Sequence, residues 1–130
     1  MMNARGFSLI ELLIVITLIV ILAAIGMPLY KNAVQRTQEA TLKENLFRMR
    51  DAIDQYYADK TKYPQSLQDL VSEKYLREVP KDPITDSVET WVEVPAEPDP
   101  NSPSAEPGVY DVKSGAEGTA MDGTTYADWN

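Results

Sequence analysis

A single carboxylate stands near the start of an almost wholly apolar stretch of the chain. This stretch spans residues 7–29, and Glu11 lies among its first residues. A charged side chain in hydrocarbon is costly unless it finds a partner or reaches the polar headgroups of the membrane. Glu11 therefore predicts either a charged partner for its carboxylate or a side chain that extends to the membrane surface.

Acidic side chains gather towards the C-terminus. Residues 81–130 contain 11 Asp or Glu and 2 Lys or Arg, whereas residues 1–80 contain 9 and 10. Such an acidic half argues against nucleic acid as a partner, because phosphates are bound by basic residues. It fits a solvated surface or a site for a hard cation.

Several common catalytic and metal-binding groups are missing from the sequence. The chain contains no histidine and no cysteine. A Ser-His or Cys-His nucleophile pair and a zinc site of thiolates and imidazoles are therefore excluded. No glycine-rich phosphate-binding loop of the dinucleotide or P-loop type occurs either. The composition thus argues against an enzyme.

The apolar stretch is long enough to cross a membrane as a helix. Residues 7–29 would extend roughly 33 Å, and the hydrocarbon core of a bilayer is about 30 Å thick. A cleaved secretory signal is the alternative, with Arg5 as its basic end and residues 23–24 as its small-residue exit. Glu11 at its head and the helical pattern that continues beyond it argue against that alternative.

The continuation, residues 30–59, has the periodicity of an amphipathic helix. Its apolar residues recur at intervals of three and four, which places them on one helical face. They are Leu42, Leu46, Met49, Ile53, Tyr56 and Tyr57. The first half of the chain therefore predicts one long helix, and its apolar stripe must be covered by the residues that follow.

A short helix and two strands are predicted beyond residue 60. Ser66 and Asp69 have the spacing of a helix cap, and the inward residues would be Leu67, Leu70, Val71 and Tyr75. Val88, Thr90, Val92 and Val94 alternate with Glu89, Trp91 and Glu93 over residues 87–94, which predicts a strand. Trp91 interrupts the polar face of this strand, so we expect it to pack or to lie at an interface. A Pro-rich loop, residues 95–107, leads to an antiparallel second strand at 108–114. Together these elements predict an α+β fold in which a long helix packs on a small antiparallel sheet.

The sequence RGFSLIELLIV, residues 5–15, closely resembles the class III signal of type IV pilins and type II secretion pseudopilins. That pattern is a basic leader ending in Gly, then Phe, then an apolar helix with Glu at its fifth position, here Gly6, Phe7 and Glu11. The segments YPQSLQDLV, VPKDPITD and GVYDVKSGAEG further resemble the major (G-type) pseudopilin. The resemblance covers nearly the whole chain and is strongest over residues 5–30.

The resemblance implies how the chain is processed. A prepilin peptidase would cleave after Gly6 and methylate the new terminal Phe7. Residues 1–6 would then be a leader peptide, residues 7–30 a transmembrane and filament-core helix, and residues 31–130 a periplasmic globular domain.

The resemblance also assigns assembly roles. Phe7, Glu11 and Pro28 would be the assembly residues, because the α-amino group of Phe7 can pair with Glu11 of its own or a neighbouring subunit. Pro28 removes one helix N–H and, with Gly26, makes residues 23–28 the expected place for a kink or for local melting.

A C-terminal calcium loop is a further feature of the G-type family. The corresponding segment offers Glu117, Asp122 and Asp128 as ligands, with Ser114, Thr124 and Thr125 nearby. It departs from the family pattern, since Glu117-Gly118 stands where Asp-Gly is usual and the loop is shorter. A solvated acidic loop closed by hydrogen bonds is the alternative to calcium, and no other cofactor is expected.

The resemblance implies a structural subunit of a pseudopilus filament. The chain would be a single-pass protein of the bacterial inner membrane that leaves the lipid bilayer to form a homo-polymer. Its other partners would be an inner-membrane assembly platform and minor pseudopilins. The alternatives are a type IV pilin, whose filament serves adhesion, motility or DNA uptake outside the cell, and a secreted periplasmic binding module.

Overall fold

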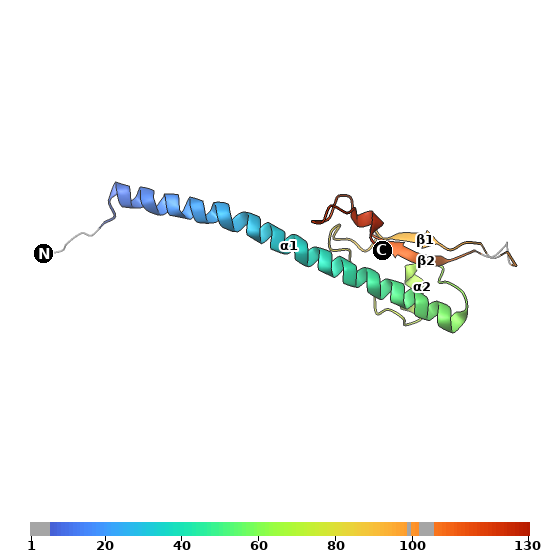
Figure 1. The fold of residues 1–130 in the computed structure, drawn as a ribbon. Coiled ribbons are helices and arrows are strands. Elements are labelled where there is room, and N and C mark those ends of the chain that lie inside the picture. The colour runs from blue at the N-terminus through green and yellow to red at the C-terminus, as the bar shows by residue number, and fades with distance from the viewer. Residues whose placement is uncertain (1–5, 99, 102–105) are drawn as a thin grey trace. The chain divides into compact units, whose positions relative to one another are not determined.

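A computed structural model describes residues 6–98, 100–101 and 106–130 of the chain. Two α-helices, two strands and one short 3₁₀ helix follow one another along it (Figure 1). They are α1 (Leu9–Lys60), α2 (Leu67–Ser72), β1 (Val92–Pro95), β2 (Val109–Lys113) and η1 (Tyr126–Asp128). This architecture confirms the predicted α+β fold. The residues divide into two compact units, one ending at Gln35 and the other spanning Arg36–Asn130.

Helix α1 runs without interruption for 52 residues, as the joined apolar and amphipathic patterns predicted. Ser8 precedes it, and its Oγ accepts a hydrogen bond of 3.3 Å from the backbone N–H of Glu11, one of the groups that have no partner inside the helix. The helix ends at Lys60, after which Thr61 has a positive φ of 54°. A left-handed residue at this position is a common helix terminator.

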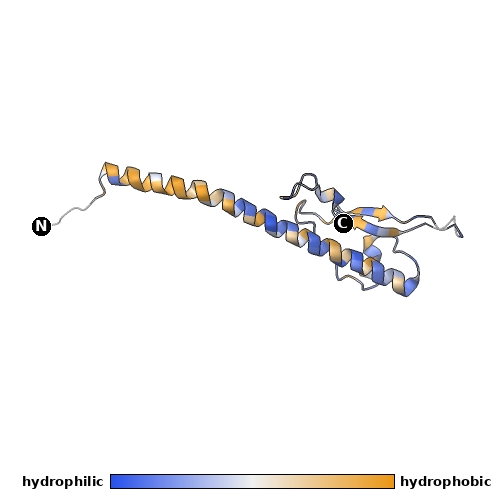
Figure 2. Cartoon of the chain, in the orientation of Figure 1, coloured by the Kyte–Doolittle hydropathy of each residue, from blue (hydrophilic) through white to orange (hydrophobic). Residues whose placement is uncertain are grey.

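The two parts of α1 differ in how they meet solvent. Apolar residues predominate along the first part after Glu11, whereas polar and apolar residues alternate further along (Figure 2). In the second part, the side chains Leu42, Leu46, Met49, Ala52, Ile53 and Tyr56 are buried. The predicted stripe is therefore confirmed except at Tyr57, which is 45 % exposed and stacks on Tyr63 at 4.5 Å between ring centroids.

The sheet consists of β1 and β2, which pair antiparallel with Val94 opposite Asp111. The antiparallel pairing was predicted, but β1 starts only at Val92, later than the strand predicted from residue 87. Trp91 is buried, whereas Val92 is 49 % exposed. The indole ring buries more apolar area than a valine, and its N–H finds a partner in the carbonyl oxygen of Pro80 at 2.7 Å.

Helix α2 begins at the predicted place but without the predicted cap. Ser66 is the N-cap residue, yet its side chain makes no capping hydrogen bond. The carboxylate of Asp69 instead accepts a hydrogen bond of 2.8 Å from the backbone N–H of Gln65. Leu67 and Leu70 are buried as predicted, and they join the core formed by α1, Trp91 and β2.

Candidate functional site

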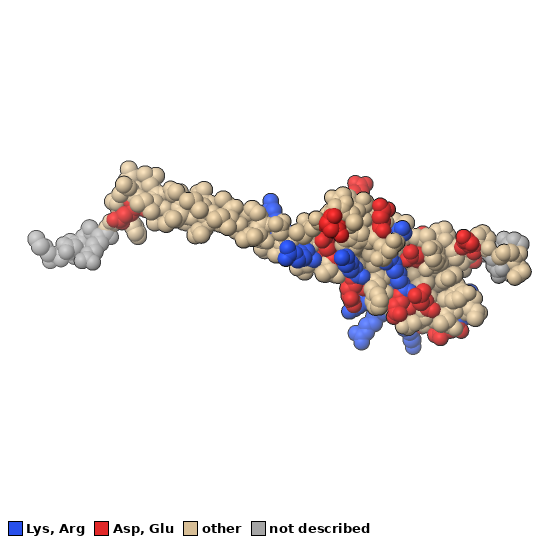
Figure 3. Space-filling model, in the orientation of Figure 1, with Lys and Arg blue, Asp and Glu red and all other residues tan. Residues whose placement is uncertain are grey.

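The apolar first part of α1 is an uncovered surface. Its large side chains are exposed, from Phe7 at 82 % to Leu29 at 65 %, and none of the apolar stretch is buried within the chain. Charged side chains gather instead over the residues that follow (Figure 3). By length and composition, α1 can cross a membrane, and its exposed apolar surface is of the kind that lipid or other protein covers.

The predicted processing and assembly residues lie at both ends of this surface. Gly6 and Phe7 precede the first turn, whereas residues 1–5 of the predicted leader lie outside the described residues. Glu11 is exposed in that first turn, and none of the described basic side chains pairs with its carboxylate. Pro28 lies inside the continuous helix, which places the predicted kink position within regular helical structure.

The three predicted calcium ligands lie in the segment after β2, and all three are exposed. Oδ1 of Asp122 accepts two hydrogen bonds from Thr124, at 2.6 Å from Oγ1 and at 3.0 Å from the backbone N–H. The Thr124 hydroxyl, through its hydrogen bond, lowers the pKa of Asp122. No group of three or more acidic side chains that could hold a metal ion occurs in the described parts of the chain. Calcium binding therefore stays a prediction from the resemblance.

Two charged residues of α1 hold this segment, and sequence reasoning missed both. Oε1 of Glu39 accepts hydrogen bonds from the Met121 backbone N–H at 2.8 Å and from the Tyr126 hydroxyl at 2.9 Å. Arg50 donates a hydrogen bond of 2.7 Å from Nη2 to the carbonyl oxygen of Trp129, and its Nε pairs with Asp111 of β2 at 2.9 Å. Their positions on the polar side of an amphipathic helix gave no sign of these partners, which are more than 60 residues away.

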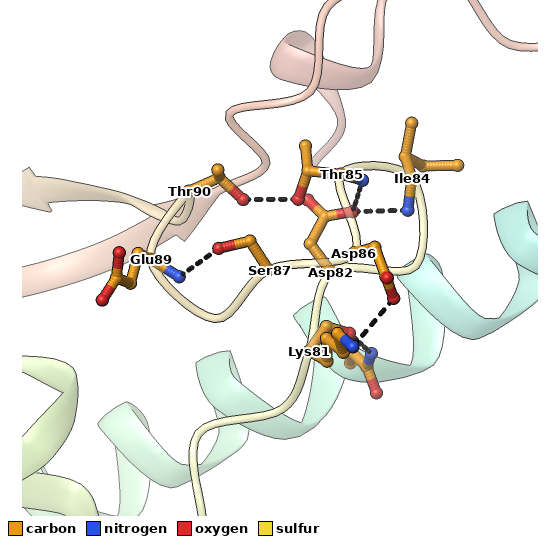
Figure 4. Close-up of polar contacts among 9 residues, drawn as sticks. Lys81, Asp82, Ile84, Thr85, Asp86, Ser87, Glu89 and Thr90 are labelled. Atoms are coloured by element: carbon orange, nitrogen blue, oxygen red, sulfur yellow. Dashed lines mark hydrogen bonds and ion pairs between the residues drawn. The ribbon is translucent and has the colours of Figure 1, made fainter.

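A buried carboxylate belongs to the Asp-Pro loop, residues 80–90. Asp82 is fully buried, and its Oδ1 accepts a hydrogen bond of 2.9 Å from the backbone N–H of Ile84 (Figure 4). Its Oδ2 accepts one of 2.6 Å from the hydroxyl of Ser114, directly after β2. The hydroxyls of Thr85 and Thr90 also share a hydrogen bond of 2.6 Å (Figure 4). The loop that the sequence marked by its resemblance is thus tied to the end of the sheet.

Comparison with known proteins connects these features to a family. Residues 1–27 match the family model of the prokaryotic N-terminal methylation motif. Type II secretion system core protein G of Klebsiella pneumoniae is 29 % identical over 64 % of this chain and 71 % of that protein. No solved structure matches the chain significantly.

Two fimbrial proteins are also similar to the chain. A fimbrial protein of Eikenella corrodens is 43 % identical over 46 % of this chain, and the type IV major fimbrial protein of Dichelobacter nodosus is 43 % identical over 45 %. The matched stretches span only 39 % and 36 % of these two relatives. The methylation motif at the head of an exposed apolar helix, the α+β domain and these relatives make the chain similar to type IV pilins and pseudopilins and support its place in their superfamily.

Proposed function

We propose that the chain is a G-type structural subunit of the helical pseudopilus filament of type II protein secretion. The observation that supports this choice best is the extent of the similarity to core protein G, which covers 64 % of this chain and 71 % of that relative. The two fimbrial proteins named above each match less than half of the chain. A match over 64 % of the chain is longer than the stretch that ends with α1 at Lys60, so it includes residues beyond the long helix.

Processing comes first in this proposal. A prepilin peptidase cleaves after Gly6 and leaves Phe7 as the methylated N-terminus. The new α-amino group then lies about one helical turn from Glu11. Because no described basic side chain pairs with Glu11, the cation comes from Phe7 of the same or a neighbouring subunit. In an apolar setting such a pair favours one register, because a displaced helix leaves both charges without partners.

Assembly then removes the apolar surface from the membrane. Before assembly the subunit is a single-pass protein of the inner membrane, with residues 31–130 in the periplasm. The inner-membrane platform and minor pseudopilins start and extend the homo-polymer. The exposed apolar side chains of residues 7–29 exchange lipid contacts for contacts with other copies. The filament moves folded proteins towards the outer membrane and carries out no chemical reaction itself.

A type IV pilin is the second candidate function. The 43 % identity to the major fimbrial protein of Dichelobacter nodosus supports it, although over a shorter stretch. Its filament would extend outside the cell and serve adhesion, motility or DNA uptake. The two candidates share processing and assembly, and they differ in where the filament ends and in what it does.

Sequencing the mature N-terminus tests the processing step. Mass spectrometry of the purified chain should give methylated Phe7 as its first residue. A terminus directly after residue 24 would instead identify a secreted module and contradict both filament candidates.

Deleting the gene separates the two filament candidates. If the chain is a pseudopilin, the deletion strain should retain folded exoproteins in the periplasm and keep its surface filaments. Loss of surface filaments with secretion intact would overturn the pseudopilin assignment in favour of a pilin. Complementation with the intact gene is the control for effects on neighbouring genes.

A further inference from the structure

The C-terminal segment, residues 114–130, is fastened to α1 at two points. At the first point, the carboxylate of Glu39 accepts hydrogen bonds from the Met121 backbone N–H and the Tyr126 hydroxyl, at 2.8 and 2.9 Å. Hydrogen bonds with a charged partner are about twice as strong as those between neutral groups. One helix carboxylate thus holds both the tip of the segment and the first residue of η1.

Arg50 provides the second point. Its Nη2 donates hydrogen bonds to the carbonyl oxygens of Trp129 at 2.7 Å and Val112 at 3.0 Å, while Nε pairs with Asp111. The guanidinium therefore joins the last residues of the chain to β2. Glu39 and Arg50 are about three helical turns apart, so they lie on the same side of α1.

The segment also closes on itself between these points. The backbone N–H of Ala120 donates to the carbonyl oxygen of Thr124 at 2.6 Å, and the indole N–H of Trp129 donates to the Thr124 hydroxyl at 2.8 Å. Asp122 uses Oδ1 to accept the two hydrogen bonds from Thr124. These bonds close the turn around residues 120–124 with groups of the chain alone.

The predicted calcium ligands do not fit this arrangement as a donor set. Calcium needs about six to eight oxygens directed at one point. Glu117, Asp122 and Asp128 do not form a group that could hold an ion, and Asp122 already serves its own turn. We infer that Glu39 and Arg50 act as a two-point clamp that holds the C-terminal segment in place of a metal ion. The inference concerns residues 36–130 alone and does not depend on which filament the chain forms.

Amide hydrogen exchange of the full chain in detergent micelles tests the clamp. Exchange is compared in millimolar calcium chloride and in EGTA, for the intact chain and for Glu39→Ala. In the intact chain, the amide hydrogen of Met121 should exchange at the same rate in both solutions. Glu39→Ala should speed its exchange about tenfold or more, because the N–H loses a charged acceptor. The amide of Val112 in β2 should keep its protection, which shows that the variant remains folded.

Two further variants make the test specific. Tyr126→Phe removes one donor to Glu39 and retains the ring, so it should speed exchange at Met121 by less than Glu39→Ala. Glu44→Ala is the matched control, since Glu44 lies on the same helix and pairs with Arg48 at the surface. It should leave the segment as protected as in the intact chain. Faster exchange of the intact chain in EGTA, or no effect of Glu39→Ala, would overturn the clamp.

Discussion

Oδ2 of Asp82 and Oγ of Ser114 lie 2.6 Å apart, and both residues are fully buried. They are 32 residues apart in the chain and join the Asp-Pro loop to the end of β2. The other oxygen of Asp82 accepts hydrogen bonds from the backbone of the loop itself. A single carboxylate thus fixes both the shape of the loop and its position on the sheet.

Asp82→Ala should therefore destabilise the globular unit strongly. Each buried group left without its partner costs roughly 1–3 kcal/mol. The variant leaves the Ser114 hydroxyl and the Ile84 N–H without their hydrogen-bond acceptor. Urea unfolding in detergent micelles can be followed with Trp91 and Trp129, the only tryptophans, both buried in this unit. Glu89→Ala, an exposed change in the same loop, is the control and should leave the free energy of unfolding within about 0.5 kcal/mol of wild type. Equal midpoints for the two variants would contradict this role of Asp82.

The hydrogen bond between Tyr75 and Asp59 predicts that the globular unit loses stability at high pH. The Tyr75 hydroxyl donates a hydrogen bond of 2.6 Å to the carboxylate of Asp59, which raises the pKa of Tyr75 to about 12 from its ordinary 10.0. Because the folded-state pKa is the higher one, this contribution is fully present below pH 10.0 and is lost as the pH rises towards 12. The intact chain should lose stability over that interval relative to Tyr75→Phe.

A difference titration checks the origin of this shift. The ultraviolet absorbance of the intact chain minus that of Tyr75→Phe isolates one phenolate among the seven tyrosines. Asp59→Asn removes the negative charge, so Tyr75 should then titrate closer to 10.0. An unchanged titration in Asp59→Asn would show that the carboxylate is not the cause.

The close approach of Gly115 to the backbone of Thr90 predicts that a larger residue at position 115 destabilises the globular unit. A side chain at this position would overlap with the backbone carbonyl oxygen of Thr90, which cannot move aside without shifting the Asp-Pro loop. Gly115→Ala should lower the free energy of unfolding by about 1–3 kcal/mol, as overpacking does elsewhere. Gly26→Ala is the control, because a methyl group there meets nothing within 4 Å and lies outside the globular unit. The tryptophan unfolding midpoint should move only in Gly115→Ala.

Glu11→Ala tests the ion pair proposed for assembly. Removing one partner of a buried pair costs about 3–5 kcal/mol, so the filament yield should fall by about two to four orders of magnitude. Thr17→Ala is a suitable control, since the Thr17 hydroxyl bonds only to the Leu13 carbonyl within its own helix. Filaments would be counted by electron microscopy at equal subunit levels. Wild-type yield from Glu11→Ala would disprove the pairing role.

Pro28→Ala tests whether the helix must loosen during assembly. Alanine restores the N–H that the Ala24 carbonyl lacks and favours helix by about 3 kcal/mol. If residues 23–28 melt locally in the filament, this variant should assemble less although its monomer is more helical. Circular dichroism in detergent micelles and filament counts measure the two effects. Normal filament yield, together with a helix unbroken through Pro28 in the filament, would contradict local melting.

The sequence by itself determined the features that depend on local pattern. Periodicity of apolar residues predicted α1 and its buried stripe, because a helix repeats its faces every three to four residues. Residues 5–15 predicted the N-terminal methylation motif that the family model matches, because such a motif is read from adjacent residues. The absence of histidine and cysteine excluded whole classes of catalytic and metal sites.

Only the tertiary structure decided which polar groups meet. Glu39 contacts Met121 across 82 residues, and Asp82 contacts Ser114 across 32. Nothing in the neighbouring residues of either carboxylate indicates such a partner. Trp91 interrupts the polar face of its strand in the sequence, but only the tertiary structure shows that its ring is buried in the core and that its N–H bonds to the carbonyl of Pro80. Local pattern fixes the elements, whereas contacts between distant residues decide which side chains they bury and where each buried charge finds its donors.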